Sequence, residues 1–258
     1  MENEKMITSV KNFLLETWIY FNIGIKQQKT LIVITSLFSM VIPLGVIIMM
    51  CMMPVEIDKE TAIIYISGNM ITSISNLCIT TLAQILIGIR SRHGFEHMAT
   101  LPISRWSPLL GNLLSSAVST IPALIVMPII GQIVFGVKVY INVIVILLIM
   151  LGVVIMAGIG AVIGTCSDNY QVSETISMIM MFFVMFATPV YYSIEKLPVI
   201  VQLFQRTLPF IYILEAIRYV MLHGSANEMV YRNIVILFIY LLIVLFFTNR
   251  FFNWNQKK

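Results

Sequence analysis

Long apolar segments constrain the fold of this 258-residue chain more than any other feature. A helix that spans the hydrocarbon core of a bilayer needs about 20 mostly apolar residues. The apolar share of 59% and the charged share of 11% agree with this reading, since soluble domains are about 45–50% apolar and about 25% charged. Six segments meet or approach the required length: Leu31–Met53, Ala62–Ile89, Leu109–Phe135, Ile141–Ile163, Ile176–Ser193 and Asn233–Phe247. The sequence therefore predicts an all-α membrane protein with six transmembrane helices in a single domain, 1–258.

A seventh apolar region, Leu197–Leu222, is not expected to span the membrane. A single lipid-facing helix there would bury too many polar and charged side chains, and proline breaks the region near its middle. Broken backbone is tolerated at membrane depth only where protein or water covers it. We therefore predict a pair of short re-entrant or interfacial helices within residues 195–230, between spans five and six. The residues that mark this pair are Pro198, Pro209, Glu215 and Arg218.

The distribution of basic and aromatic residues predicts the orientation. Six spans place both termini on one side, and cytoplasmic loops carry an excess of Lys and Arg. Trp18, Trp106 and Trp254 flank spans on the same side, as expected for residues that prefer the membrane interface. Both termini are thus predicted to be cytoplasmic, and the net charge of +4 reflects topology rather than a nucleic-acid partner. Ten of the 16 basic residues lie on that side: Lys5, Lys11, Lys26, Lys29, Arg90, Arg92, Arg105, Arg250, Lys257 and Lys258.

Residues 1–29 carry the pattern of an amphipathic helix lying in the membrane interface. Apolar side chains recur at steps of three and four, which places them on one helical face. They are Ile7, Val10, Phe13, Leu14 and Trp18. Such a helix serves either as a simple anchor or as an elbow that braces a moving bundle.

The first inner loop, residues 90–106, is the most informative polar stretch. It is predicted to form a short basic helix with Glu96 in its middle, ending near Pro102 because proline disfavours helix in the preceding residue. Phe95, Met98 and Leu101 would then share one side. An apolar ridge with a central acid is typical of a docking surface for a soluble protein, but a loop that only reverses the chain would fit as well.

The same loop contains His93-Gly-Phe-Glu-His97, which matches the H-x-x-E-H pattern of some zinc proteases. Two histidines four residues apart could bind zinc, with Glu96 as general base. Gly94 weakens the helix, however, and no further carboxylate is singled out as the third ligand. The intramembrane metalloprotease is therefore the less favoured interpretation, and no metal site is predicted.

The second predicted span carries a stripe of polar residues. Their steps of four, three, four and four place them on one helical face, and such side chains face protein or water rather than lipid. They form either hydrogen bonds between helices or the lining of a transport path or subunit interface. The stripe consists of Asn69, Ser73, Asn76, Thr80 and Gln84.

Two further features concern spans four and five. A G-x-x-x-G pattern at Gly160–Gly164 predicts close helix packing, because small residues let backbones approach. Asp168 and Glu174 are expected in an inner loop before span five. That span is rich in Met and Phe, which suits lipid contact and would also suit an adaptable apolar ligand.

Motifs for energy conversion or catalysis are missing from the sequence. It contains no G-x-x-x-x-G-K-[ST] phosphate loop and no G-x-S-x-G nucleophile turn. Any work done by this protein must therefore be driven by a partner or an ion gradient.

Two segments resemble the membrane subunit of type-2 ABC exporters, the permeases that pair with a separate ATPase. The first is Arg92-His-Gly-Phe-Glu-His-Met-Ala-Thr-Leu-Pro-Ile-Ser-Arg, which departs from the family pattern at Phe95 and Leu101. The second runs from Glu195-Lys-Leu-Pro-Val-Ile-Val-Gln to Thr207-Leu-Pro-Phe-Ile-Tyr-Ile-Leu-Glu-Ala-Ile-Arg-Tyr, where Leu208 replaces the usual Asn. Together with the six spans and the amphipathic start, the resemblance covers essentially the whole chain.

The resemblance implies an elbow helix over residues 1–29, outer re-entrant helices over 195–230, and two permease subunits with two cytoplasmic ABC ATPase subunits. The second permease would be an identical copy or a different chain. ATP and Mg would bind to the ATPase, so this chain would be a permease rather than an enzyme and would hold no cofactor. Loop 90–106 would dock into the ATPase as the coupling helix, through Arg92, Gly94, Phe95, Glu96, Met98, Leu101 and Pro102.

The function implied by the resemblance is export of a hydrophobic drug, antibiotic or peptide-like substrate across a bacterial cell membrane. An alternative within the family is export of polysaccharide or teichoic acid precursors, although the start of the chain, residues 16–24, does not resemble that branch. A non-transporting membrane scaffold is an alternative of a different class. Strict dependence on an ATPase partner separates the exporter from the scaffold and the protease.

Overall fold

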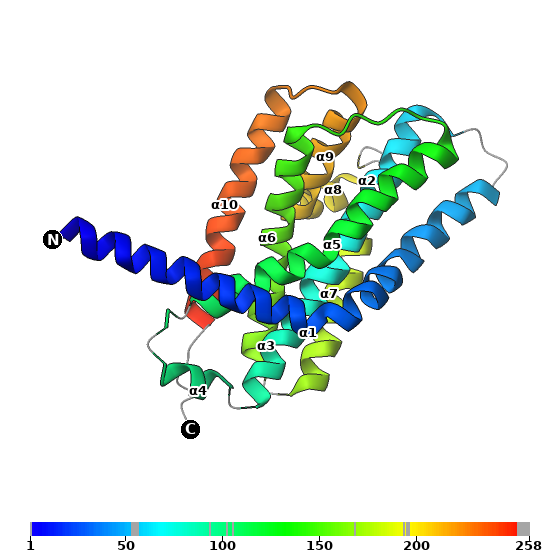
Figure 1. The fold of residues 1–258 in the computed structure, drawn as a ribbon. Helices are drawn as coiled ribbons and strands as arrows, with labels where there is room; N and C mark the ends of the chain where they lie inside the picture. Colours follow the sequence, from blue (N-terminus) through cyan, green and yellow to red (C-terminus); the bar gives the residue numbers. More distant parts are fainter. Residues whose placement is uncertain are drawn as a thin grey trace.

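A computed structural model describes residues 2–52, 57–92, 94–101, 103–104, 106–167, 169–192, 194 and 197–251. Within these residues all regular secondary structure is helical, and Figure 1 shows the helices gathered in one bundle. The helices are α1 (Glu2–Met52), α2 (Lys59–Ser75), the π-helix η1 (Asn76–Thr81), α3 (Leu82–Ser91), α4 (Gly94–Ala99), α5 (Trp106–Phe135), α6 (Val143–Cys166), α7 (Tyr170–Ala187), α8 (Val199–Gln205), α9 (Pro209–His223) and α10 (Glu228–Phe251).

Five helical stretches are long and apolar enough to cross a membrane: Lys59–Ser91, Trp106–Phe135, Val143–Cys166, Tyr170–Ala187 and Glu228–Arg250. They correspond to predicted spans two to six. The predicted first span, Leu31–Met53, lies in the second half of α1, with part of it outside the described residues. The all-helical membrane fold predicted from the sequence is thus confirmed.

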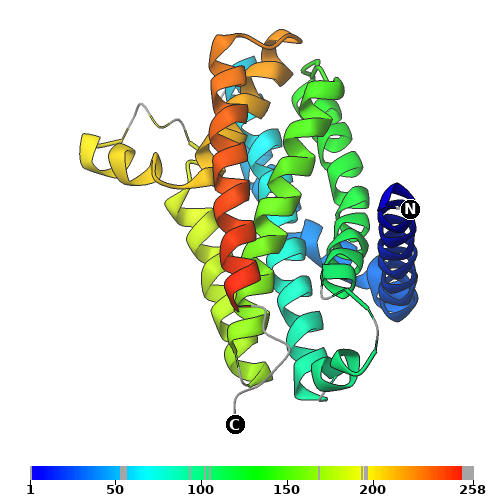
Figure 2. The ribbon, with the colours of Figure 1, turned by 90° about the vertical axis from the view of Figure 1, so that its left-hand side faces the viewer.

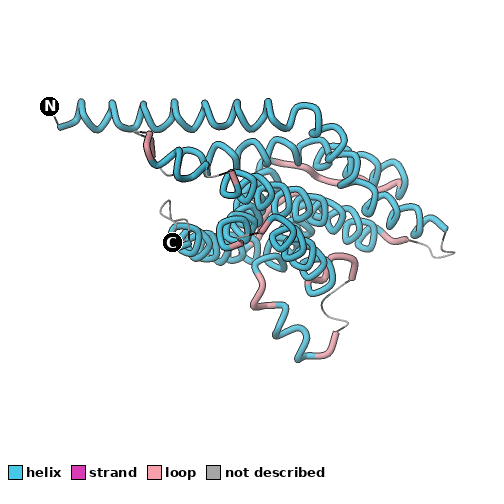
Figure 3. The backbone as a smooth tube through the Cα atoms, turned by 90° about the horizontal axis from the view of Figure 1, so that it is seen from below, coloured by secondary structure: helices cyan, strands magenta, loops and turns pink. Residues whose placement is uncertain are grey.

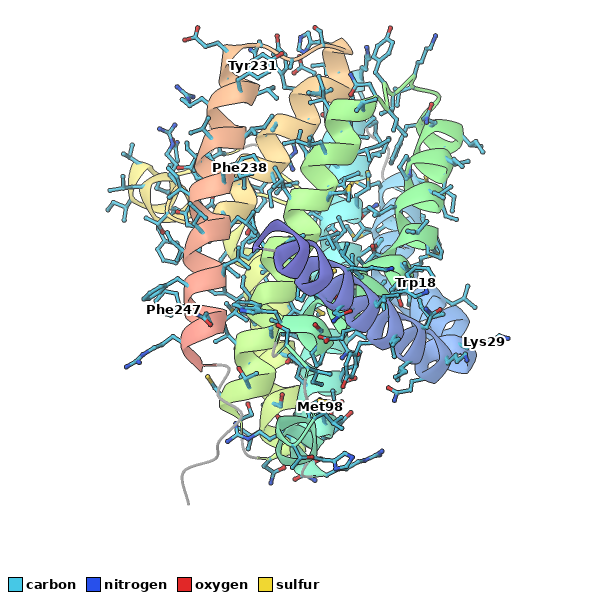
Figure 4. The ribbon with its side chains drawn as sticks, turned by 60° about the vertical axis from the view of Figure 1, so that its left-hand side comes forward. Trp18, Lys29, Met98, Tyr231, Phe238 and Phe247 are labelled. Atoms are coloured by element: carbon cyan, nitrogen blue, oxygen red, sulfur yellow. The ribbon has the colours of Figure 1, made fainter. Side chains whose placement is uncertain are left out.

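The continuous stretch α2–η1–α3 forms the centre of the bundle. It is the most deeply buried of the candidate spans, and helices α5, α6, α7 and α9 pack against it. Side chains such as Ile66, Ile71 and Leu86 are fully enclosed there. The least buried of the candidate spans, α10, instead exposes aromatic side chains along its length, as Tyr231 and Phe238 illustrate in Figure 4.

Helix α1 is continuous but changes direction. Figure 1 shows its first part crossing the bundle and its second part rising beside α5, and Figure 3 shows the same two helices side by side from below. We call residues 2–29 of α1 the N-terminal arm. Leu14 of the predicted apolar face is exposed on the surface, as is Trp18 (Figure 4). The function of the arm as a membrane-interface elbow stays a prediction.

The boundaries of α7 correct the sequence-based expectation. This helix begins at Tyr170 rather than Ile176, because the side chain of Asn169 accepts a hydrogen bond from Gln171 N and caps it. It ends at Ala187 because Pro189 favours extended backbone at Thr188. Glu174 therefore lies in a helix and not in a loop.

Two segments, the start of α2 and the connection between α5 and α6, close the end of the bundle opposite α4 by binding carbonyls at and just after the end of α9. Lys59 Nζ donates to Leu222 O at 3.4 Å, and the backbone N–H of Tyr140 donates to Met221 O at 3.1 Å. Asn142 Nδ2 donates to the carbonyl of Gly224, at 3.0 Å. These bonds satisfy carbonyls that a helix end leaves free.

The G-x-x-x-G pattern packs as predicted. A Cβ atom at Gly160 would lie 2.6 Å from Ile79 O, and one at Gly164 would lie 2.6 Å from Ala83 O. Helix α6 therefore touches the backbone of η1 and α3 directly.

We expect Gly160→Val to lower the melting temperature of the detergent-solubilised protein by several degrees, because its side chain would collide with backbone that cannot yield. The matched control is Gly88→Ala on α3, where an added Cβ meets nothing within 4 Å and helix propensity improves by about 1 kcal/mol. Thermal unfolding followed by size-exclusion chromatography makes the comparison. Equal melting temperatures for Gly160→Val and the control would contradict the packing.

Candidate functional site

The predicted coupling loop contains a short helix, α4, as expected. Figure 1 places α4 at the end of the bundle where the described chain ends, between α3 and α5. Gly94 starts α4 against the end of α3, since its Cβ would lie 2.8 Å from Ile89 O. Met98 (Figure 4) is half-buried against the core, whereas Arg92 and Leu101 are exposed.

Several predicted residues of this loop lie outside what the structure describes. They are His93 and Pro102, together with the side chains of Phe95 and Glu96. The helix backbone at Glu96 is described, but the direction of its carboxylate is not. Among the described residues, no three His, Cys, Asp or Glu side chains form a group that could hold a metal ion.

The loop is joined firmly to the bundle through α3. The guanidinium of Arg90, in the last turn of α3, donates through Nη1 to Thr165 O near the end of α6. A cation is favourable there because carbonyls at a helix C-terminus carry partial negative charge. This bond ties the end of α3, next to α4, to the end of α6.

Two residues of the polar stripe, Asn69 and Ser73, form its upper half, which is buried within the chain. Asn69 is 1% exposed and Ser73 is not exposed at all. Neither amide atom of Asn69 nor the hydroxyl of Ser73 has a hydrogen-bond partner in the part of the chain that the structure describes. An unpaired buried polar group costs about 1–3 kcal/mol, so this arrangement is not explained by hydrogen bonding between helices.

The other three residues, Asn76, Thr80 and Gln84, form the lower half of the stripe, which is half-buried and makes different contacts. Thr80 Oγ1 donates to Asn76 O within η1. Gln84 Nε2 lies 3.5 Å from Glu174 Oε1, a contact that links α3 to α7. The correction of Glu174 from loop to helix therefore also gives the stripe its one side-chain hydrogen bond with another helix among the described residues.

The two halves meet at the π-helix η1. A π-helix closes its hydrogen bonds five residues apart and therefore holds one residue more than the α-helical turn it replaces; such segments are frequent at functional sites. The stripe changes from fully buried to half-buried at this segment. The sequence could not reveal η1, because the observed steps of four, three, four and four fit an ordinary α-helix.

The predicted pair of short helices is confirmed as α8 and α9. Pro198 precedes α8, Pro209 begins α9, and the two helices meet at 95°. Figure 2 shows α8 projecting sideways from the bundle, away from the N-terminal arm. Most of its apolar side chains are exposed, including Ile200 and Leu203. Helix α9, in contrast, is packed into the core.

Two tyrosine hydroxyls hold the connection between these helices. Tyr212 Oη donates to Arg206 O at 2.7 Å, and Tyr240 Oη donates to Thr207 O at 2.7 Å. These hydroxyls bind carbonyls of the turn between α8 and α9 that lie outside both helices.

Arg218 is the centre of the largest hydrogen-bond cluster at this site. Its Nη2 donates to Pro189 O at 2.6 Å and Val190 O at 2.8 Å, while Nε donates to Ser67 Oγ at 3.1 Å. Nη1 lies 3.5 Å from Tyr192 O. The guanidinium thus joins α9 to α2 and to the irregular segment after α7.

Glu215, one turn before Arg218, has a different environment. Asn233 Nδ2 approaches Glu215 Oε2 at 3.5 Å and Tyr212 O at 3.4 Å. This contact joins α9 to α10. Sequence reasoning singled out both charged residues, but their carbonyl, hydroxyl and amide partners carry no pattern that would identify them.

The comparisons with known proteins decide the family. A family model described as ABC-2 type transporter matches residues 7–222, which is most of the chain. The chain belongs to the ABC-2 type transporter family. A search of the curated proteins finds no match.

This ABC-2 permease is therefore a multi-pass membrane subunit of an ABC transporter and is not itself catalytic. Membership also implies an ABC ATPase as partner. The match includes α4, the polar stripe and both helices of the α8–α9 pair, so all three parts of the candidate site lie within the family region.

We expect deletion of Thr81 to be tolerated, because removing the extra residue of η1 converts it to an α-helical turn and leaves the flanking faces aligned. Deletion of Ile64 in α2 is the control, since it rotates the preceding residues by about 100°. The yield and elution profile of fluorescent fusions compare the two variants. Equal loss of folded protein in both would show that η1 does not hold a spare residue.

We expect Arg218→Met to lower the melting temperature clearly, since the carbonyls of Pro189 and Val190 would lose their donors, at roughly 1–3 kcal/mol for each unpaired group. Arg218→Lys should restore only part of the loss, because one ammonium cannot replace a fork of guanidinium donors. Arg232→Met, at an exposed position of α10, controls for removal of a positive charge. If Arg218→Met and that control had equal melting temperatures, the hydrogen bonds of Arg218 would not contribute to stability.

Proposed function

We propose that this permease is the membrane subunit of an ATP-driven exporter and that its ATPase docks on loop 90–106. The observation that carries the proposal is the position of α4. This helix caps one end of the bundle and connects α3, which is part of the central span, with α5. In an ABC-2 permease without a phosphate loop of its own, the energy must enter through such a contact.

In this proposal the docking surface combines charge and an apolar ridge. Arg92, just before α4, is exposed and available to an acidic partner, and Leu101, just after α4, is exposed as well. Glu96 would be the central contact, with Gly94, Phe95, Met98 and Pro102 completing the surface. ATP-driven closure of the ATPase can move α4 only if the ATPase binds the two conformations of the permease with different affinity.

The polar stripe is the proposed border of the translocation path. Asn69 and Ser73 are buried without hydrogen-bond partners among the described residues, which favours a second state in which water or cargo pairs with them. Asn76, Thr80 and Gln84 continue this border toward α4. The half-buried lower part and the buried upper part then correspond to a path that is closed at its upper end.

The cargo that fits best is a hydrophobic drug, antibiotic or peptide-like molecule. Helix α7 exposes Met178, Phe182 and Phe186 on one side, and α8 exposes a further apolar surface. A second permease, identical or different, would cover part of this surface and enclose the path. The proposed location is a bacterial cell membrane with both termini and α4 on the cytoplasmic side.

The first experiment is a pull-down in mild detergent from native membranes, with wild type compared with Glu96→Arg. An ATP-binding protein should co-purify with the wild type, and its yield should fall at least several-fold with the variant, because a reversed charge would face the docking site. The matched control is Glu228→Arg, the same substitution at an exposed residue at the opposite end of the bundle.

Equal ATPase recovery with Glu96→Arg and Glu228→Arg would remove Glu96 from the docking surface. If no ATPase is recovered with any of the three proteins, the exporter loses its energy source. Metal analysis of the same sample then tests the zinc protease alternative.

A further inference from the structure

The carboxylate of Glu16 lies at the start of α5, although the two are far apart in the sequence. Glu16 Oε2 accepts a hydrogen bond from the backbone N–H of Ser104 at 3.0 Å and another from Ser107 Oγ at 2.7 Å. The N–H of Ser104 lies just before α5, and the hydroxyl of Ser107 belongs to its first turn. The partial positive charge at a helix N-terminus favours a carboxylate at this place. Glu16 therefore anchors the start of α5 from outside that helix.

This contact begins a close seam between the N-terminal arm and α5, which run in the same direction (Figure 3). One turn further on, a Cβ atom at Gly111 would lie 2.9 Å from Thr17 O and 2.5 Å from Tyr20 Cβ. Another turn on, a Cβ atom at Gly24 would lie 2.4 Å from Ser115 Oγ. The two helices thus touch through small residues, and Glu16 supplies the charged contact at the seam's first turn.

The position of Ser104 gives the contact its importance. Ser104 lies at the end of loop 90–106, five residues after α4 ends at Ala99 and two before α5 begins at Trp106. A force on α4 reaches α5 through this short segment. Glu16 holds the segment, and through it the force also reaches the arm.

We propose that Glu16 is a positioning residue that makes the N-terminal arm and the start of α5 move as one body when the ATPase displaces α4. This inference rests on the proposed function of loop 90–106 as the docking site. A hydrogen bond to a charged group shifts an equilibrium by about tenfold or more. Replacement of Glu16 should therefore raise, by about tenfold, the population in which the N-terminal arm is detached from the start of α5.

The test measures the distance between spin labels on the arm and on the loop. Labels are placed at Lys11→Cys and Thr100→Cys, both exposed positions, in a background where the exposed Cys51 and Cys166 are replaced by Ser. Pulsed electron resonance is recorded in nanodiscs, first on the permease alone and then on its complex with the co-purified ATPase, with and without ATP. Retention of the ATPase is checked for each labelled protein.

Three variants distinguish an effect of the Glu16 hydrogen bonds from a general loss of stability. Glu16→Leu removes both hydrogen bonds, while Glu16→Gln keeps a carbonyl oxygen that can accept them. Ser107→Ala removes one donor and leaves the Ser104 N–H. Because Glu16 and Ser107 act through one contact, the double variant Glu16→Leu with Ser107→Ala should be no worse than Glu16→Leu alone.

With Glu16 present, we expect a narrow distance distribution that ATP leaves unchanged. Glu16→Leu should broaden it and make its mean depend on ATP, and Glu16→Gln should restore most of the wild-type distribution. A distribution unchanged by Glu16→Leu would overturn the proposal, as would additive effects of Glu16→Leu and Ser107→Ala. The recording without ATPase tests the hydrogen bonds of Glu16 even if no ATPase is found. Failure of the docking proposal is therefore recognised separately.

Discussion

The fold depends on how the chain satisfies backbone carbonyls where helix α7 ends within a membrane protein. No water is available in the hydrocarbon core, so protein groups must pair any carbonyl that a broken helix leaves free. Arg218 meets this requirement by donating to the carbonyls of Pro189 and Val190 and by bonding Ser67 on α2. Helix α2 and the segment after α7 approach each other so closely that a Cβ atom added at Gly68 would collide with Val190 O. The irregular segment, the central span and α9 are thus fixed against one another.

Apolar length and proline position made the large features of the fold predictable. They determine where a helix can lie in a bilayer and where it must stop, so five of the spans and the break at Pro209 could be placed from the sequence. The small residues Gly160 and Gly164 likewise predicted a backbone contact, because few other arrangements make use of two glycines one turn apart.

Features set by a single capping residue or by non-local contacts were harder to predict. The start of α7 depends on Asn169, whose capping capacity is the same in any loop, and Glu174 was misplaced as a result. Glu16 carries no pattern that links it to Ser104, because a backbone N–H has no side-chain signature. Of the candidate site, the α8–α9 pair and the helix around Glu96 were predictable as backbone, whereas the partners of Arg218 were not.

The closure of the bundle opposite α4 has a practical consequence. Lys59 is far in the sequence from Tyr140 and Asn142, yet all three bind carbonyls at the end of α9. Their surroundings form a discontinuous epitope that exists only while these helix ends are in register. A nanobody selected against that surface would therefore recognise the folded bundle and not the denatured chain. It would also add rigid mass to a 29.3 kDa membrane protein, which aids particle alignment in cryo-electron microscopy.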